Sequence, residues 1–179
     1  INILRVTYSI PIIGIEPAIK PAALNSKTKT VGILATQGTL TSDLFHKTTN
    51  LFAGNIKVIE RNGEGIVELI EGGQLHSEAM KALLKLYLQP MIVADIDYLV
   101  LGCTHYPYLM PLLVKLLPNH VKIIDSGDAV ARQTKAILEK YDLLNTETKN
   151  GKCQFFTNGN PEVMASLLEH TFEVQRLDF

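Results

Sequence analysis

Short and almost wholly apolar runs alternate along the chain with longer stretches of helical pattern, and this alternation constrains the fold more than any other feature. A strand that is buried on both faces reads as a continuous apolar run, which is typical of a parallel sheet covered by helices. We predict strands of this kind at residues 10–17, 29–36, 55–61, 97–102 and 120–125. The sequence therefore favours an α/β fold with a parallel sheet.

Helical patterns fill the intervals between these strands. We expect a helix after residue 39 with Leu40, Leu44 and Leu51 on its apolar side, capped by Thr39, Thr41 or Ser42. Further helices are expected at residues 65–89 (broken at Gly72 and Gly73), 107–117 and 127–144. A polar linker at 145–152 then precedes a strand, a turn and a helix that reach residue 170.

Composition excludes several classes of protein. The 17 Lys and Arg residues are balanced by 18 Asp and Glu, so no strongly basic face for nucleic acid is expected. No apolar run approaches the roughly 20 residues that cross a bilayer, which argues against a membrane partner. The two cysteines, Cys103 and Cys153, have neither a disulfide framework nor a zinc-type spacing, so a reducing cytoplasm is expected.

Reactive side chains crowd the end of the predicted strand at 97–102. Cys103, Thr104 and His105 follow Gly102 in the stretch "GCTHYP". In open parallel sheets, ligands bind beyond the carboxyl ends of the strands, so these residues lie at an expected ligand edge. Thiol and imidazole together can transfer protons or attack an electrophile. The alternative is structural, because a cysteine at a strand end is more often a buried core residue.

Another stretch, "RNGEGIVE" at residues 61–68, is rich in glycine. A dinucleotide fingerprint would need a third glycine after Gly63 and Gly65, at the position that Glu68 occupies. Nucleotide binding is therefore not expected. His46, His76, His120 and His170 are scattered without ligand spacing and are expected at surface or satisfied core positions.

The segment "LGCTHYPYL" resembles the second cysteine signature of the glutamate racemases, which belong to the aspartate/glutamate racemase superfamily. The resemblance extends over most of the chain through "PIIGIEPAIKPA", "VGILATQGTLTSDLF", "VELIEGG" and "IIDSGDAVA". It implies cofactor-independent racemisation of glutamate for peptidoglycan synthesis, by two cysteines on opposite faces of the substrate Cα and without a metal. It leaves a homodimer open.

The resemblance also implies roles for particular residues. Cys103 would be the catalytic cysteine of the second domain, His105 its acid/base helper, and Thr104 with His105 would bind the polar groups of the amino acid. Glu71 matches the glutamate of the family best, and Glu68, one helical turn earlier, is the less favoured candidate. A solvated helix face is the alternative for both glutamates.

The implied fold has two three-layer αβα domains related by pseudo-twofold symmetry. Residues 18–123 would form the second domain, and residues 1–17 and 124–179 would be remnants of an incomplete first domain. The first cysteine motif of the family, a "CNTA"-like sequence, has no match here, so the chain as given is expected to be inactive alone.

Two other motifs superficially fill that gap. Cys153 in "GKCQFF" has no adjacent histidine and is expected to be a core thiol, while Ser126 or Asp128 in "DSGDAVA" is expected to cap a helix. Two alternatives to a glutamate racemase stay open. One is a racemase for aspartate or a related amino acid, and the other is a non-catalytic domain that binds small acids or another protein.

Overall fold

The computed structural model describes residues 1–52, 56–145 and 151–178. Four strands form a parallel sheet in the order β2-β1-β3-β4. These strands are β1 (Thr30–Ala35), β2 (Lys57–Asn62), β3 (Tyr98–Gly102) and β4 (Lys122–Ile124). The strands predicted around residues 29–36, 55–61, 97–102 and 120–125 are thus confirmed, although residue 55 lies outside the described residues.

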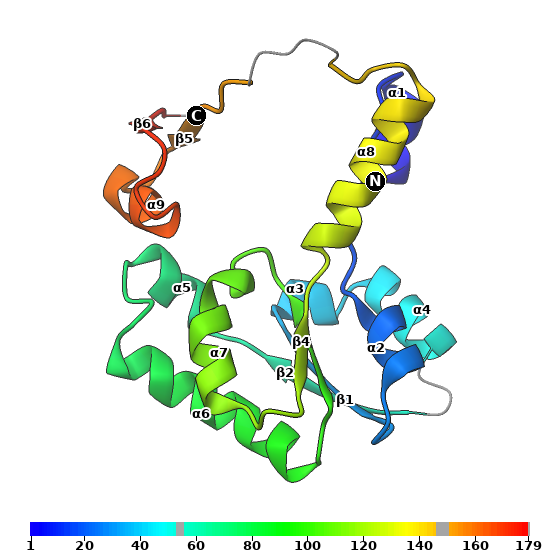
Figure 1. The fold of residues 1–179 in the computed structure, drawn as a ribbon, viewed down its shortest axis with the longest axis vertical. Coiled ribbons are helices and arrows are strands. Elements are labelled where there is room, and N and C mark those ends of the chain that lie inside the picture. The colour runs from blue at the N-terminus through cyan, green and yellow to red at the C-terminus, as the bar shows by residue number, and fades with distance from the viewer. Residues whose placement is uncertain (53–55, 146–150, 179) are drawn as a thin grey trace.

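Helices cover both faces of this sheet, as Figure 1 shows. On one face lie α5 (Ile66–Glu71), α6 (Glu78–Val93) and α7 (Met110–Leu116), which pack against Leu34, Leu99 and Leu101. On the other face lie α2 (Ile19–Asn25), α3 (Gln37–Leu40) and α4 (Asp43–Phe52), which pack against Val31, Ile33 and Val100. Successive side chains of β1 and β3 enter opposite clusters, as the two-residue period of a strand requires.

Burial explains why the central strands could be predicted from the sequence. Every residue of β1 and β3 is buried, so neither strand shows an alternation of polar and apolar residues. The helical pattern at 65–89 is broken as expected: α5 ends at Glu71, the capping residue is Gly72, and α6 begins after Ser77, whose hydroxyl accepts from the N–H of Met80. The parallel, helix-covered architecture is therefore the predicted one.

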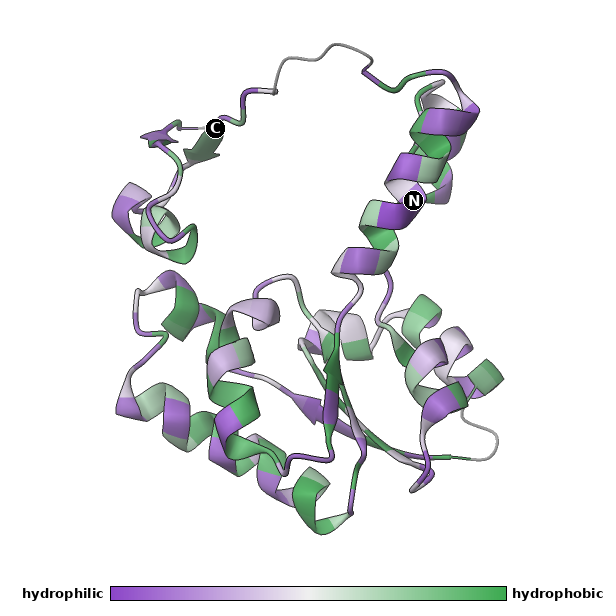
Figure 2. Cartoon of the chain, viewed as in Figure 1, coloured by the Kyte–Doolittle hydropathy of each residue, from purple (hydrophilic) through white to green (hydrophobic). Residues whose placement is uncertain are grey.

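The remaining elements lie outside this sheet. They are α1 (Asn2–Thr7), α8 (Gly127–Lys140), α9 (Pro161–Leu167) and a small parallel sheet of β5 (Phe155–Thr157) and β6 (Val174–Arg176). In Figure 1, α8 extends away from the four-stranded sheet beside α1, while α9 lies next to α5. Neither α1 nor α8 has a buried residue, and Val6 is 86% exposed. Figure 2 shows hydrophobic residues interspersed with hydrophilic ones along α8.

Several expectations about local structure were wrong. Residues 10–17 are not a strand, and Ile10 and Ile15 are exposed, because among the described residues this segment has no strand beside it to pair with. Phe45, rather than Leu44 or Leu51, is the buried residue of α4. The helix α2 and the strand β6 were not predicted. Residues 146–150 of the predicted linker lie outside the described residues.

Candidate functional site

A pocket of about 570 Å³ opens at the carboxyl edge of the sheet. The residues that line it follow three of the strands: Thr36 comes after β1, Cys103 and Thr104 come after β3, and Asp125 comes after β4. Glu16 and Ser126 add polar groups from the segments that connect the sheet to the outer elements. This is the edge at which the topology predicts a ligand.

Three of the candidate residues form a connected set. The Sγ of Cys103 lies 3.9 Å from Nδ1 of His105, and Nε2 of the same ring lies 3.0 Å from Oε1 of Glu71. Cys103 is partly buried, whereas the side chains of His105 and Glu71 are 31% and 63% exposed. Both imidazole nitrogens thus have a partner, one of them a thiol and the other a carboxylate.

Local structure brings these groups together. The chain turns sharply after β3, where the N–H of Tyr106 donates to the carbonyl of Cys103, and the 3-10 helix η1 (Tyr106–Leu109) begins. Pro107 is tolerated in η1 because the first N–H groups of a helix need no internal partner. Glu71 is the last residue of α5, which places its carboxylate beside this turn.

Of the two candidate glutamates, only Glu71 pairs with His105 among the described residues. Glu68 is exposed in the first turn of α5. Thr104 is exposed and lines the pocket, so its side chain is accessible to a ligand there.

Two contacts behind the site were not foreseen. The hydroxyl of Thr39 donates to the carbonyl of Gly102 at 3.0 Å and contacts the hydroxyl of Thr36, which caps α3. The hydroxyl of Tyr106 donates to the carbonyl of Gly63 at 3.2 Å, and burial raises the pKa of that phenol. The bonds from Thr39 to Gly102 and from Tyr106 to Gly63 join residues far apart in sequence, so no local pattern could have indicated them.

Other expectations about this region need correction. Cys153 is exposed rather than a core thiol, and it does not line the pocket. Ser126 precedes α8 but makes no capping hydrogen bond, because its hydroxyl donates instead to the carbonyl of Glu16. The N–H of Gly127 is bound by the Asp125 carboxylate at 2.6 Å. Asp128 lies in the first turn of α8, where an acidic side chain is favourable.

No three His, Cys, Asp or Glu residues within the described part of the chain lie together as a metal site would require. Across the same residues, every helix is too short or too polar to span a bilayer.

The chain is similar to known racemases in sequence. The family model for Asp/Glu/Hydantoin racemase matches residues 1–134. A glutamate racemase of Pseudomonas putida is 46% identical over 158 residues, which are 88% of this chain and 59% of that protein. A glutamate racemase of Herpetosiphon aurantiacus is 40% identical over 167 residues, which are 93% of this chain and 66% of that protein. The chain therefore spans less than two thirds of the length of these curated relatives.

Crystal structures of glutamate racemases share the fold. The Escherichia coli enzyme, in complex with L-glutamate and the activator UDP-MurNAc-Ala, has a TM-score of 0.80 at 32% identity over 98% of this chain and 68% of that one. The RacE1 isoform of Bacillus anthracis has a TM-score of 0.80 at 29% identity over 99% of this chain and 68% of that one. With a family match over residues 1–134 and neighbours of the same architecture, the chain belongs to the Asp/Glu/Hydantoin racemase family.

Proposed function

We propose that this chain is part of a glutamate racemase, which inverts glutamate by removing the proton from Cα on one face and returning a proton on the other. The observation that carries the proposal is the contact series Cys103, His105 and Glu71, in which Cys103 lines the pocket and the other two residues lie behind it. A thiol linked to an imidazole can give up and recover a proton, which is the chemistry that inversion at Cα requires. The glutamate racemases among its relatives support the choice of substrate.

The geometry supports a distinct role for each of the three side chains. Glu71 accepts a hydrogen bond from Nε2 of His105, which keeps the proton on that nitrogen and leaves the lone pair of Nδ1 facing the thiol. Nδ1 then takes the proton of Cys103, and the thiolate removes the proton from the substrate Cα. In the reverse direction, the thiol of Cys103 returns a proton to the carbanion and Nδ1 reprotonates the sulfur.

Thr104 is proposed to hold the substrate. A Cα–H bond is a very weak acid, so the charged ends of the amino acid must be fixed while negative charge develops. The exposed Thr104 offers a hydroxyl and a backbone N–H at the mouth of the pocket, one residue from the reactive sulfur. Both groups can donate to a carboxylate. The two ring nitrogens of His105, by contrast, are already engaged by Cys103 and Glu71.

A second proton-transfer group is needed on the opposite face of Cα. We propose that it is a cysteine in the part of the relatives that this chain does not span, so that residues 1–179 alone do not racemise glutamate. In this arrangement residues 18–123 form the second domain, and residues 1–17 and 124–179 belong to the first, with the substrate held between them. The complete enzyme would act in the cytoplasm and supply D-glutamate for peptidoglycan, without a cofactor.

The test follows solvent deuterium into Cα of L- and D-glutamate by NMR, using residues 1–179 and the complete protein. We expect exchange with inversion in the complete protein alone, and its loss in Cys103→Ala. Inversion of aspartate but not of glutamate would transfer the assignment to an aspartate racemase. Absence of inversion for both amino acids would leave only a binding role.

A further inference from the structure

A buried hydrogen bond joins the two backbone segments that carry the proton relay of Cys103, His105 and Glu71. Tyr106 is completely buried, and its hydroxyl donates to the carbonyl of Gly63 at 3.2 Å. Gly63 has no room for a side chain, because a Cβ at that position would overlap the Tyr106 hydroxyl. The Tyr106 hydroxyl thus occupies the space beside Gly63.

Each end of this hydrogen bond continues directly into one half of the relay. The carbonyl of Gly63 also accepts the N–H of Ile66, the first residue of α5, and α5 ends at Glu71. At the other end, the N–H of Tyr106 donates to the carbonyl of Cys103, and His105 is the neighbouring residue. The separation of His105 from Glu71 therefore depends on how these two segments are held.

The contact between His105 and Glu71 contributes little to holding the two segments together. With side chains 31% and 63% exposed, the pair of His105 and Glu71 is close to a surface ion pair, which loses side-chain entropy when it forms and gains little energy in water. The hydrogen bond from Tyr106 to the Gly63 carbonyl loses much less entropy when it forms, because the tyrosine side chain is already buried. The same loop is held from a second side, because the hydroxyl of Tyr87 on α6 donates to the carbonyl of Glu64 at 2.9 Å.

We infer that Tyr106 is a positioning residue: by binding the Gly63 carbonyl it holds α5 against the turn after β3 and sets the distance from His105 to Glu71. This inference rests on the proposed function. Tyr106 acts through the relay and does not touch the substrate, so its removal should lower kcat and leave KM unchanged.

The experiment uses the complete enzyme with Cys153→Ser, which removes an exposed thiol that does not line the pocket. In Tyr106→Phe we expect kcat to fall by up to about 100-fold, the loss that a misplacement of about 1 Å can cause. In a Glu71→Ala background the same change should have almost no further effect, because that side chain can no longer accept from His105 and the pair that Tyr106 positions is lost. Gly63→Ala keeps the hydroxyl but displaces it, and should reproduce the loss.

The matched control is Tyr108→Phe. Tyr108 lies in the same 3-10 helix, is partly exposed, and its hydroxyl makes no hydrogen bond within the described residues, so its rates should equal those of the parent. Equal losses for Tyr106→Phe in both backgrounds, a rise in KM alone, or a Tyr106→Phe protein that unfolds would each overturn the inference.

A second measurement needs no racemisation. The rate at which iodoacetamide alkylates Cys103 reports how readily the thiol loses its proton. We expect a slower rate in Tyr106→Phe and no additional slowing when Glu71→Ala is present. An unchanged rate would overturn the inference even if the parent enzyme inverts glutamate. A parent enzyme that does not invert glutamate would refute the proposed function, and this rate would still test the role of Tyr106.

Discussion

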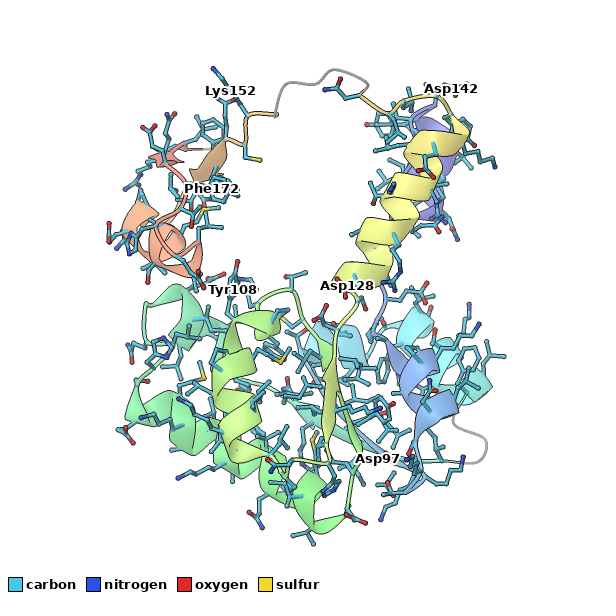
Figure 3. All side chains as sticks on the ribbon, in the orientation of Figure 1. Asp97, Tyr108, Asp128, Asp142, Lys152 and Phe172 are labelled. Atoms are coloured by element: carbon cyan, nitrogen blue, oxygen red, sulfur yellow. The ribbon has the colours of Figure 1, made fainter. Side chains whose placement is uncertain are left out.

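Asp97 offers the sharpest test of what stabilises this fold. The residue precedes β3 at the amino end of the sheet, far from Tyr108 in Figure 3, and is only 8% exposed. Its carboxylate accepts three hydrogen bonds, from the hydroxyl of Ser26 at 2.7 Å and from the backbone N–H groups of Lys27 at 2.5 Å and Thr28 at 3.2 Å. Burial disfavours the charge, but these bonds outweigh it and lower the pKa of Asp97.

We predict that Asp97→Asn lowers the free energy of unfolding by about 2 kcal/mol at neutral pH. The amide can keep all three contacts, with its oxygen facing Lys27 and Thr28 and its NH₂ facing the Ser26 hydroxyl. Each contact then changes from charge-assisted to neutral, a difference of about 1 kcal/mol per bond. The smaller desolvation cost of an amide offsets about a third of that sum.

Urea unfolding followed by circular dichroism measures this change. With a slope of about 2 kcal/mol per molar, the midpoint should fall by about 1 M. The pKa of Asp97 is lower in the folded than in the unfolded protein, so its stabilisation is complete above the unfolded value of about 3.9 and is lost as the pH falls through the folded value. The difference between parent and variant should therefore be full at pH 7 and shrink below about pH 4.

Asp95→Asn is the control, because it makes the same chemical change two residues earlier at an exposed site. Asp95 has a positive φ of 56°, which asparagine also tolerates, and its contact with His120 is a surface pair at 3.5 Å. Its effect should stay within about 0.5 kcal/mol. Equal midpoints for the two variants, or a difference between Asp97→Asn and the parent that persists unchanged below pH 3, would refute the reasoning.

Three further predictions concern the site. In the complete enzyme, Cys103→Ser should reduce inversion of glutamate by at least about 1,000-fold, because a hydroxyl is a far poorer proton donor and acceptor at Cα than a thiol, as deuterium exchange at Cα would measure. Glu71→Gln should lower kcat by about 10-fold or more while Glu68→Gln leaves it unchanged, since Glu71 is the one of these two glutamates that contacts His105; equal rates for the two variants would contradict the relay. Gly102→Ala should destabilise the protein by about 1–3 kcal/mol, because the new Cβ would lie 2.6 Å from the Cβ of Ala35 on β1; an unchanged melting temperature would show that the strands can move apart.

The core was predictable from the sequence where a strand is buried on both faces, because such a strand is a continuous apolar run. The runs at 29–36 and 97–102 belong to β1 and β3, which are buried on both faces and so contain almost no polar residues. The run at 10–17 is just as apolar, yet it forms no strand. A strand also needs a neighbour to accept its hydrogen bonds, and apolar composition alone does not say whether one is present.

Some features of the site could likewise be predicted from the sequence and others could not. Cys103, Thr104 and His105 are adjacent in sequence, so their grouping at a strand end could be recognised, and the family resemblance singled out Glu71 as the partner. The bonds from Tyr106 to Gly63 and from Thr39 to Gly102 depend on how β2, β1 and β3 align, which no local pattern encodes. The prediction that Cys153 is buried was wrong for a related reason. The residue precedes the small sheet of β5 and β6, whose two short strands bury little.

The buried strand β3 separates Asp97 from Cys103 by a fixed length. Its five residues are hydrogen-bonded in register with β1, from Tyr98 opposite Val31 to Gly102 opposite Ala35. Deleting or inserting one residue in β3 would turn every following side chain to the opposite face of the sheet. Either the Asp97 hydrogen bonds or the position of the Cys103 thiol at the pocket would then be lost. Substitutions that tune stability at Asp97 should therefore leave the chemistry at Cys103 untouched, whereas a change in the length of the strand cannot preserve both.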